Sequence, residues 1–306
     1  MFQTLLCFWS CWMAQALAIS PSIHNTNSNI HNPNNNSHLR VIVVGGSSGM
    51  GKAAASQILK QGGKVLLVSR SQEKLEKARD NLIQECHLDK NDDGSISLAS
   101  VDVTQEDEVA ALAQSTLFQS TAWNGLVVTA AGKAPHGPVA SLPPIDARGL
   151  LDSKLWGAYY CAHYWGPHLD TTHGAAVVFC AGVLNRRPGL NCAPLAMANG
   201  ALEGLTRTLA LEWGPLGVRV NCLSPGFCDT ERFDHMDPTR KQAMLENTAA
   251  SLPLQTVGQP RDMGEAIFYL LTAPFCTGVV LDVDGGHGIR QYANPTKDPM
   301  RQGTKQ

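Results

Sequence analysis

Three glycines near the start of the chain have the spacing needed to hold a phosphate group. Gly45, Gly49 and Gly51 follow the apolar residues 41–44 and precede an Ala-rich stretch with helical periodicity. Gly45 permits a tight turn, Gly49 lets a diphosphate approach the backbone, and Gly51 allows the following helix to pack closely. Free amide groups at the start of that helix would face the phosphates. The pattern therefore predicts a dinucleotide-binding turn rather than a purely structural one.

A second chemical signal lies at the end of the next apolar run, residues 65–68. A dinucleotide fold usually places an acidic residue here, on a ribose diol. This chain has Ser69 followed by Arg70. A carboxylate would repel a 2′-phosphate, whereas a guanidinium can pair with it through two hydrogen bonds. The two residues therefore favour NADP(H) over NAD(H), the alternative being that Arg70 is an exposed charge at a strand end.

The elements that must position these residues alternate along the chain. Apolar runs predict strands, and stretches with helical periodicity separate them. The alternation predicts an α/β fold with a single Rossmann-type, doubly wound parallel sheet and helices on both faces. The predicted strands are 41–44, 65–70, 96–103, 124–132, 175–180, 218–223 and 278–283, and the predicted helices include 52–61, 72–86, 105–118, 149–165 and 194–213.

The glycine spacing Gly-x-x-x-Gly-x-Gly resembles that of the short-chain dehydrogenase/reductase family, and the resemblance extends from about Arg40 to Gly288. It implies that Asp102 lies near the adenine, that Pro225-Gly226 backs the nicotinamide, and that Thr230 bonds its carboxamide. The cofactor-binding residues that it implies are Gly45, Ser47, Ser48, Gly49, Met50, Gly51, Ser69, Arg70, Asp102, Val103, Ala131, Gly132, Pro225, Gly226 and Thr230.

The positions that correspond to the family's catalytic residues differ from its pattern. In the family, a Tyr donates a proton, a Lys one helical turn later lowers the Tyr pKa, and a Ser holds the substrate oxygen. Residues 200–206 match the family's residues after that Lys, which places the Tyr and Lys at Leu195 and Asn199. No Ser follows strand 175–180 near Gly182, and Lys154 replaces a family Asn.

Lys154 is the first candidate for a relocated proton donor, because a lysine in an apolar cleft can have a lowered pKa. Asn199 is the second candidate catalytic residue, since it can still hydrogen-bond a ribose. Alternatively, Lys154 replaces the lost lysine as a ribose or phosphate contact, or lies exposed. Tyr159, Tyr160 or His136 could instead supply the proton.

Three functions therefore remain open. The first is an NADP(H)-dependent oxidoreductase acting on a carbonyl or alcohol substrate with a non-standard proton donor. The second is a non-redox isomerase or cyclase on the same fold. The third is a catalytically inactive, nucleotide-binding regulatory protein. NADPH consumption with a panel of carbonyl compounds would separate the first from the other two.

Composition and charge limit the partners. The net charge of −2 over 306 residues provides no basic field for a nucleic acid. His163, His168 and His173 are five residues apart and do not share a helix face, so no metal site is expected. Cys180 and Cys222 lie in apolar runs and are predicted to be buried free thiols. A small-molecule substrate and a homo-oligomer, formed through the final helix and last strand, are expected from the resemblance.

The two ends of the chain differ in composition from its middle. Residues 1–20 form an apolar, signal-like leader, 21–38 an Asn/Ser-rich linker, 39–290 the NAD(P)-binding domain, and 291–306 a polar tail. We expect the leader to direct the protein to the ER or an organelle, such as a plastid, because NADPH is an intracellular cofactor. No stable membrane insertion is expected once the leader is cleaved, although an uncleaved anchor is the alternative.

Overall fold

The computed structural model describes residues 36–89 and 94–289. The predicted leader, the linker as far as residue 35 and the polar tail lie outside the described residues. Within the described part, no helix is both long and apolar enough to cross a bilayer. The description that follows concerns the compact unit Asn35–Gln306.

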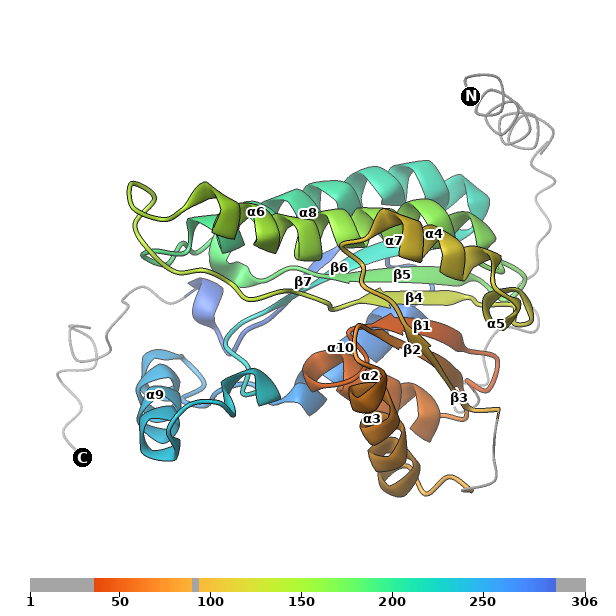
Figure 1. The fold of residues 1–306 in the computed structure, drawn as a ribbon, viewed down its shortest axis with the longest axis horizontal. Coiled ribbons are helices and arrows are strands. Elements are labelled where there is room, and N and C mark those ends of the chain that lie inside the picture. The colour runs from red at the N-terminus through yellow and green to blue at the C-terminus, as the bar shows by residue number, and fades with distance from the viewer. Residues whose placement is uncertain (1–35, 90–93, 290–306) are drawn as a thin grey trace. The chain divides into compact units, whose positions relative to one another are not determined.

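The described residues form a seven-stranded parallel sheet with helices on both faces, which confirms the predicted fold class. The strand order is β3-β2-β1-β4-β5-β6-β7 (Figure 1). It reverses between β1 and β4, and such a switch point opens a crevice at the carboxyl ends of the strands. The strands are β1 (Arg40–Val44), β2 (Lys64–Ser69), β3 (Ile96–Ser100), β4 (Gly125–Val128), β5 (Ala175–Cys180), β6 (Val218–Pro225) and β7 (Val280–Val283).

The register places the carboxyl ends of the central strands at one edge of the sheet. Val44 pairs with Val128, and Cys180 pairs with Leu223. The segments that leave β1, β4, β5 and β6 therefore begin side by side, although they lie far apart in the sequence. This edge of the sheet is where the predicted site residues gather.

Helices cover both faces of the sheet, with α4, α7 and α8 on one face and α2, α3 and α10 on the other (Figure 1). The α-helices are α2 (Gly49–Lys60), α3 (Gln72–Glu85), α4 (Glu106–Gln114), α5 (Thr116–Gln119), α6 (Pro144–Leu151), α7 (Gly157–Trp165), α8 (Ala193–Trp213), α9 (Pro238–Ser251) and α10 (Pro260–Thr272). Short helical segments are η1 (Asp152–Trp156), η2 (Gly166–His168), η3 (Val183–Asn185), η4 (Gly214–Leu216), η5 (Glu231–Phe233) and η6 (His287–Ile289).

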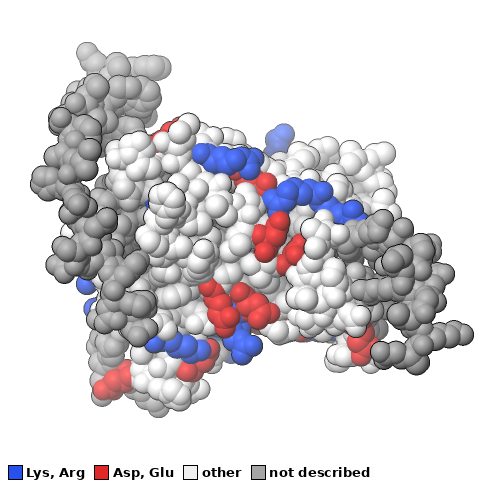
Figure 2. All heavy atoms as spheres, turned by 180° about the vertical axis from the view of Figure 1, so that it is seen from behind, with Lys and Arg blue, Asp and Glu red and all other residues white. Residues whose placement is uncertain are grey.

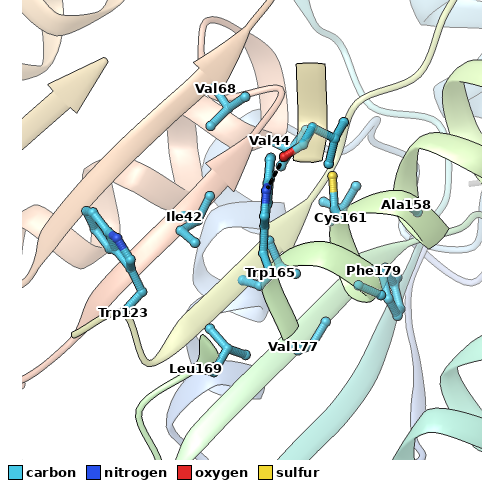
Figure 3. Packing of buried hydrophobic residues seen from close by; sticks show 14 of the residues in the cluster. Ile42, Val44, Val68, Trp123, Ala158, Cys161, Trp165, Leu169, Val177 and Phe179 are labelled. Atoms are coloured by element: carbon cyan, nitrogen blue, oxygen red, sulfur yellow. Dashed lines mark hydrogen bonds between the residues drawn. The ribbon is translucent and has the colours of Figure 1, made fainter. Parts of the chain in front are cut away.

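The apolar run of β1 serves two cores because successive side chains of a strand point to opposite faces. Ile42 belongs to the core beneath α4, α7 and α8, whereas Val43 belongs to the core beneath α2, α3 and α10. Figure 3 shows the first core, in which Trp165 and Phe179 are fully buried. The Trp165 indole donates to the Val109 carbonyl at 2.9 Å, so its burial leaves no unpaired donor.

Several predicted elements are shorter or more divided than the sequence indicated. Strand β4 spans Gly125–Val128 rather than 124–132, and β7 spans Val280–Val283 rather than 278–283. Strand β3 ends at Ser100 rather than at residue 103, because Asp102 accepts hydrogen bonds from Thr104 and turns the chain. The helix predicted at 105–118 is split at Ser115, which is extended and caps the Phe118 amide. The helix predicted at 149–165 contains the π-helical segment η1, which carries Lys154.

The described part of the face seen in Figure 2 carries Lys and Arg close to Asp and Glu, with wide uncharged areas between them. The charges of both signs are interspersed, in keeping with a net charge of −2 for the whole chain. Cys180 and Cys222 are buried and free, as predicted.

Candidate functional site

The turn after β1 has the backbone geometry that a phosphate-binding turn requires. Gly45 has φ +81°, and a Cβ on it would lie 2.7 Å from Thr129 Oγ1. A Cβ on Gly51 would lie 2.3 Å from the Gly45 carbonyl oxygen. Helix α2 therefore approaches the end of β1 more closely than any side chain would allow. Exposed Ser48 precedes α2 without capping it, and Met50 packs partly against the core.

Five of the predicted cofactor contacts lie around the ends of β2 and β3. Ser47 Oγ donates to Ser69 Oγ at 3.1 Å. Arg70 is 68% exposed, and its Nη1 lies 3.8 Å from Asp102 Oδ2. The Arg70 guanidinium is therefore open to a further anionic partner. Val103 is buried and packs against Gly157.

The segment after β4 is tied to two other parts of the chain at Gly132. Its amide donates to Ser153 Oγ at 2.8 Å, and its carbonyl accepts from Arg232 Nη2 at 2.8 Å. A Cβ on Gly132 would lie only 2.7 Å from Ser153 Oγ, so the close approach depends on glycine. Ala131, just before it, is exposed. Ser153 and Arg232 were not singled out from the sequence, because neither belongs to a motif.

The segment 225–230 runs from the end of β6 to the glycine turn. It contains the predicted contacts Pro225, Gly226 and Thr230. The Gly226 amide donates to the Val283 carbonyl at 3.0 Å, and a Cβ on Gly226 would lie 2.6 Å from Asp284 Cα. A Cβ on Gly49 would lie 3.5 Å from Thr230 Cγ2. The segment after β6 therefore lies beside the start of α2.

Lys154 is buried in η1, with only 7% of its surface exposed. Its Nζ donates to the Cys180 carbonyl at 2.9 Å and to the Ala181 carbonyl at 3.0 Å. An ammonium group has three donors, so these bonds leave one for a ligand. Burial lowers the pKa of Lys154. The alternative that this lysine is exposed is therefore excluded.

Asn199 lies on α8, one helical turn after Leu195, and only 1% of its surface is exposed. Among the described residues its Oδ1 has no hydrogen-bond partner. Its Nδ2 would lie 3.0 Å from a Cβ on Gly182, which has φ +152°. A serine at 182 would therefore be strained and would press on Asn199. Lys154 bonds the carbonyl of Ala181, the residue before Gly182. The two predicted catalytic residues therefore come together around Gly182.

A histidine and a cysteine meet at the start of α8. Cys192 Sγ lies 3.4 Å from His136 Nδ1, and the Gly137 amide donates to the Asn191 carbonyl at 3.1 Å. Burial raises the pKa of the Cys192 thiol. The loop that contains His136 is thus held near the helix that carries Asn199. The sequence indicated His136 but gave no sign of its partner, 56 residues away.

A charged cluster joins the exit of β5 to its neighbours. Arg186 hydrogen-bonds Glu203 on α8, Ser224 on β6 and Asp282 on β7. The Glu203 side chain is only 7% exposed, and Arg207 also lies 3.7 Å from it. Arg186 therefore ties the exit of β5 to α8, β6 and β7. Sequence reasoning did not find this cluster, because Arg186 belongs to no motif.

Comparison with known proteins decides the family. A family model described as enoyl-(acyl carrier protein) reductase matches residues 44–288. A solved structure of a short chain dehydrogenase/reductase family protein is 27% identical, with a TM-score of 0.69, and the match covers 82% of this chain and 98% of that one. The chain belongs to the short-chain dehydrogenase/reductase family.

Two further relatives of this short-chain dehydrogenase/reductase add detail. The chain is 31% identical to the L-fucose dehydrogenase of Oryctolagus cuniculus, over 80% of this chain and 84% of that one. It is also 25% identical to an NADPH-bound short-chain oxidoreductase from Pseudomonas aeruginosa PAO1 that contains an atypical catalytic centre. That match has a TM-score of 0.74 and covers 85% of this chain and all of the other.

The two tyrosines considered as proton donors, and the histidines considered for a metal site, contact other residues in this family member. Tyr159 is exposed and stacks on His163, whose ring centroid lies 6.3 Å away, and His168 packs against Phe118. Tyr160 packs partly against the core. The described part of the chain contains no cluster of three or more His, Cys, Asp or Glu side chains placed to hold a metal ion.

Proposed function

We propose that this short-chain dehydrogenase/reductase is an NADP(H)-dependent oxidoreductase that interconverts a carbonyl compound and an alcohol with a non-standard proton donor. The observation that carries the proposal is that three features lie at the carboxyl ends of the strands. They are the glycine turn, the exposed Arg70 and the buried pair Lys154 and Asn199.

The described residues fit a dinucleotide. The amide groups at the start of α2 would hold the diphosphate, and Arg70 with Ser69 would hold the 2′-phosphate. Asn199 Oδ1 is a buried acceptor without a partner among the described residues, so a ribose hydroxyl that donates to it would satisfy it. Pro225, Gly226 and Thr230 would lie beside the nicotinamide.

Lys154 is the proposed source of the proton. A bound dihydronicotinamide supplies the hydride for carbonyl reduction, and the chain must supply a proton to the oxygen. The Lys154 ammonium has one free donor, gives that proton to the developing alkoxide, and is left as a neutral amine. Burial favours the neutral amine, which makes proton release easier than from an exposed lysine. The atypical catalytic centre of the Pseudomonas aeruginosa relative supports a departure from the family's usual residues.

Nucleotide binding to the purified protein, measured by calorimetry, tests the cofactor assignment. NADPH should bind about 100-fold more tightly than NADH, since Arg70 is a charged, bidentate partner for a phosphate. Arg70→Asp should remove or reverse that preference. Arg79→Asp, on the exposed surface of α3, is the control and should leave it unchanged. Failure to bind either nucleotide would refute the oxidoreductase proposal and leave the fold as a scaffold for another role.

Location and assembly are further proposals. A leader directs the protein to the ER or an organelle, and a fluorescent fusion of residues 1–38 tests this, with diffuse cytosolic signal as the contrary result. The homo-oligomer forms through α10 and the edge strand β7, where Tyr269, Phe275 and Val279 are exposed apolar residues.

A further inference from the structure

One acidic side chain lies against the start of α2. Glu231 directly follows Thr230, and its Oε2 accepts a hydrogen bond from the Gly49 amide at 2.8 Å. Its Oε1 accepts from Lys52 Nζ at 2.9 Å. A single carboxylate therefore bridges the first residue of α2 and a lysine in the same turn. The positive end of a helix favours a negative charge at this point.

The position matters because the same amide group is expected to receive a diphosphate. Two anions cannot share the Gly49 amide, and like charges at hydrogen-bond distance repel strongly. Partial desolvation raises the pKa of Glu231, but hydrogen bonds from its own amide, Lys52 and Gly49 lower it overall. The carboxylate is therefore charged at neutral pH.

We propose that Glu231 is a built-in competitor for the diphosphate site and that a dinucleotide displaces it, taking over both the Gly49 amide and Lys52. Lys52, which belongs to none of the predicted contacts, becomes a diphosphate-binding residue. This inference rests on the proposed function, since it requires a dinucleotide in the crevice.

The segment that carries Glu231 leads into a helix that is not buried. Helix α9, which follows in the chain, has no buried residue. Lys241 on α9 binds Asp229 and Asp234 at 3.1 Å and 3.0 Å, so the residues around η5 are linked to α9. Arg232 holds the same segment to Gly132. Displacement of Glu231 removes one attachment and leaves the Arg232 bond in place.

Calorimetric titration of the full chain with NADPH tests the proposal through Glu231→Gln. We call a molecule open when Glu231 has left the Gly49 amide. The apparent Kd for NADPH equals the intrinsic Kd divided by the fraction of open molecules. If the contact keeps about one molecule in ten open, the variant should bind NADPH about tenfold more tightly. Glu246→Gln, on the exposed surface of α9, is the matched control and should leave the Kd unchanged.

A second ligand and a second variant separate this effect from a general change of charge. Adenosine 2′-monophosphate lacks the diphosphate, so Glu231→Gln should not alter its affinity. Lys52→Met should weaken NADPH binding about fivefold to tenfold in the Glu231→Gln background. In the wild type it should weaken binding less, because there it also releases the competing carboxylate.

Each outcome decides the proposal. Unchanged NADPH affinity in Glu231→Gln, or equal tightening of adenosine 2′-monophosphate, would overturn it while leaving the proposed function intact. If Lys52→Met does not weaken NADPH binding in the Glu231→Gln background, Lys52 does not belong to the diphosphate site. Additive effects of the two substitutions would contradict the competition between Glu231 and the diphosphate for Lys52. If neither the wild type nor the variant binds NADPH or NADH, the proposed function fails and this inference fails with it.

Discussion

At the scale of single residues, Lys154 combines burial with donors that are only partly used. Its two backbone partners are carbonyl oxygens at the end of β5, which accept hydrogen bonds but carry no full charge. The ammonium is therefore oriented but not neutralised by a carboxylate among the groups that shift its pKa. This combination suits a proton donor better than a structural ion pair.

The pH dependence of the reduction rate follows from this environment. Because the ammonium is the active form, the rate should be constant at low pH and fall as pH rises through the lowered pKa of Lys154. The fall should begin below the ordinary lysine value of about 10.4. Lys154→Met should lower kcat by about 100-fold to 10,000-fold and leave the NADPH Kd nearly unchanged.

A variant of His136 tests whether this histidine, rather than Lys154, causes the pH dependence of the reduction rate. His136→Gln should preserve the fall in rate at high pH if Lys154 is the donor. If this variant instead loses both the rate and the fall, the histidine held by Cys192 is the donor and the assignment to Lys154 is wrong. Lys133→Met, an exposed lysine in the neighbouring loop, controls for the loss of a positive charge.

At the scale of the elements, the Arg186 cluster joins the exit of β5 to α8, β6 and β7. Glu203 is almost fully buried, so it depends on Arg186 for a close counter-charge. Removing one partner of such a pair leaves an uncompensated charge, which costs more than the pair itself contributes. The cluster therefore keeps the helix that carries Asn199 aligned with the end of β6.

Chemical denaturation tests this role. Arg186→Met should lower the free energy of unfolding by about 2–3 kcal/mol, since Arg186 itself is partly exposed and Arg207 remains nearby. The double variant Arg186→Met/Glu203→Leu should recover most of the loss because no buried charge is then left alone. Arg79→Met, which breaks an exposed pair, should change stability by less than about 0.5 kcal/mol. If Arg186→Met and Arg79→Met lower the free energy of unfolding by the same amount, this assignment is wrong.

At the scale of the whole molecule, exposed apolar residues lie on α10 and in the segment that joins it to the edge strand β7. Phe275 is fully exposed at 104%, and Tyr269 and Val279 are also exposed. Exposed apolar side chains beside the edge of a sheet favour an interaction site there. A second copy of the chain is the partner that we expect there.

Analytical ultracentrifugation checks the assembly. Phe275→Glu should shift the protein to a smaller species by placing a charge in a desolvated contact. Leu211→Glu, an exposed substitution on α8, should leave the assembly unchanged. If the α8 variant dissociates the protein and the Phe275 variant does not, the interface lies on the other face of the sheet.

The sequence by itself determined the alternation of strands and helices, the glycine turn and the register of Asn199 and Lys154. These features depend on local periodicity and on backbone sterics, which short stretches of sequence specify. The sequence also predicts that the family's catalytic tyrosine and lysine positions fall on Leu195 and Asn199, because residues 200–206 match the family's residues after that lysine.

Only the tertiary structure decided which distant side chains meet. Glu231 lies on Gly49 across 182 residues, and Arg186 reaches Asp282 across 96. Such contacts follow from the strand order, which brings separate loops to one edge of the sheet. No local pattern marks them. An acidic residue in a loop is expected to be an exposed charge until the fold places it at a helix N-terminus.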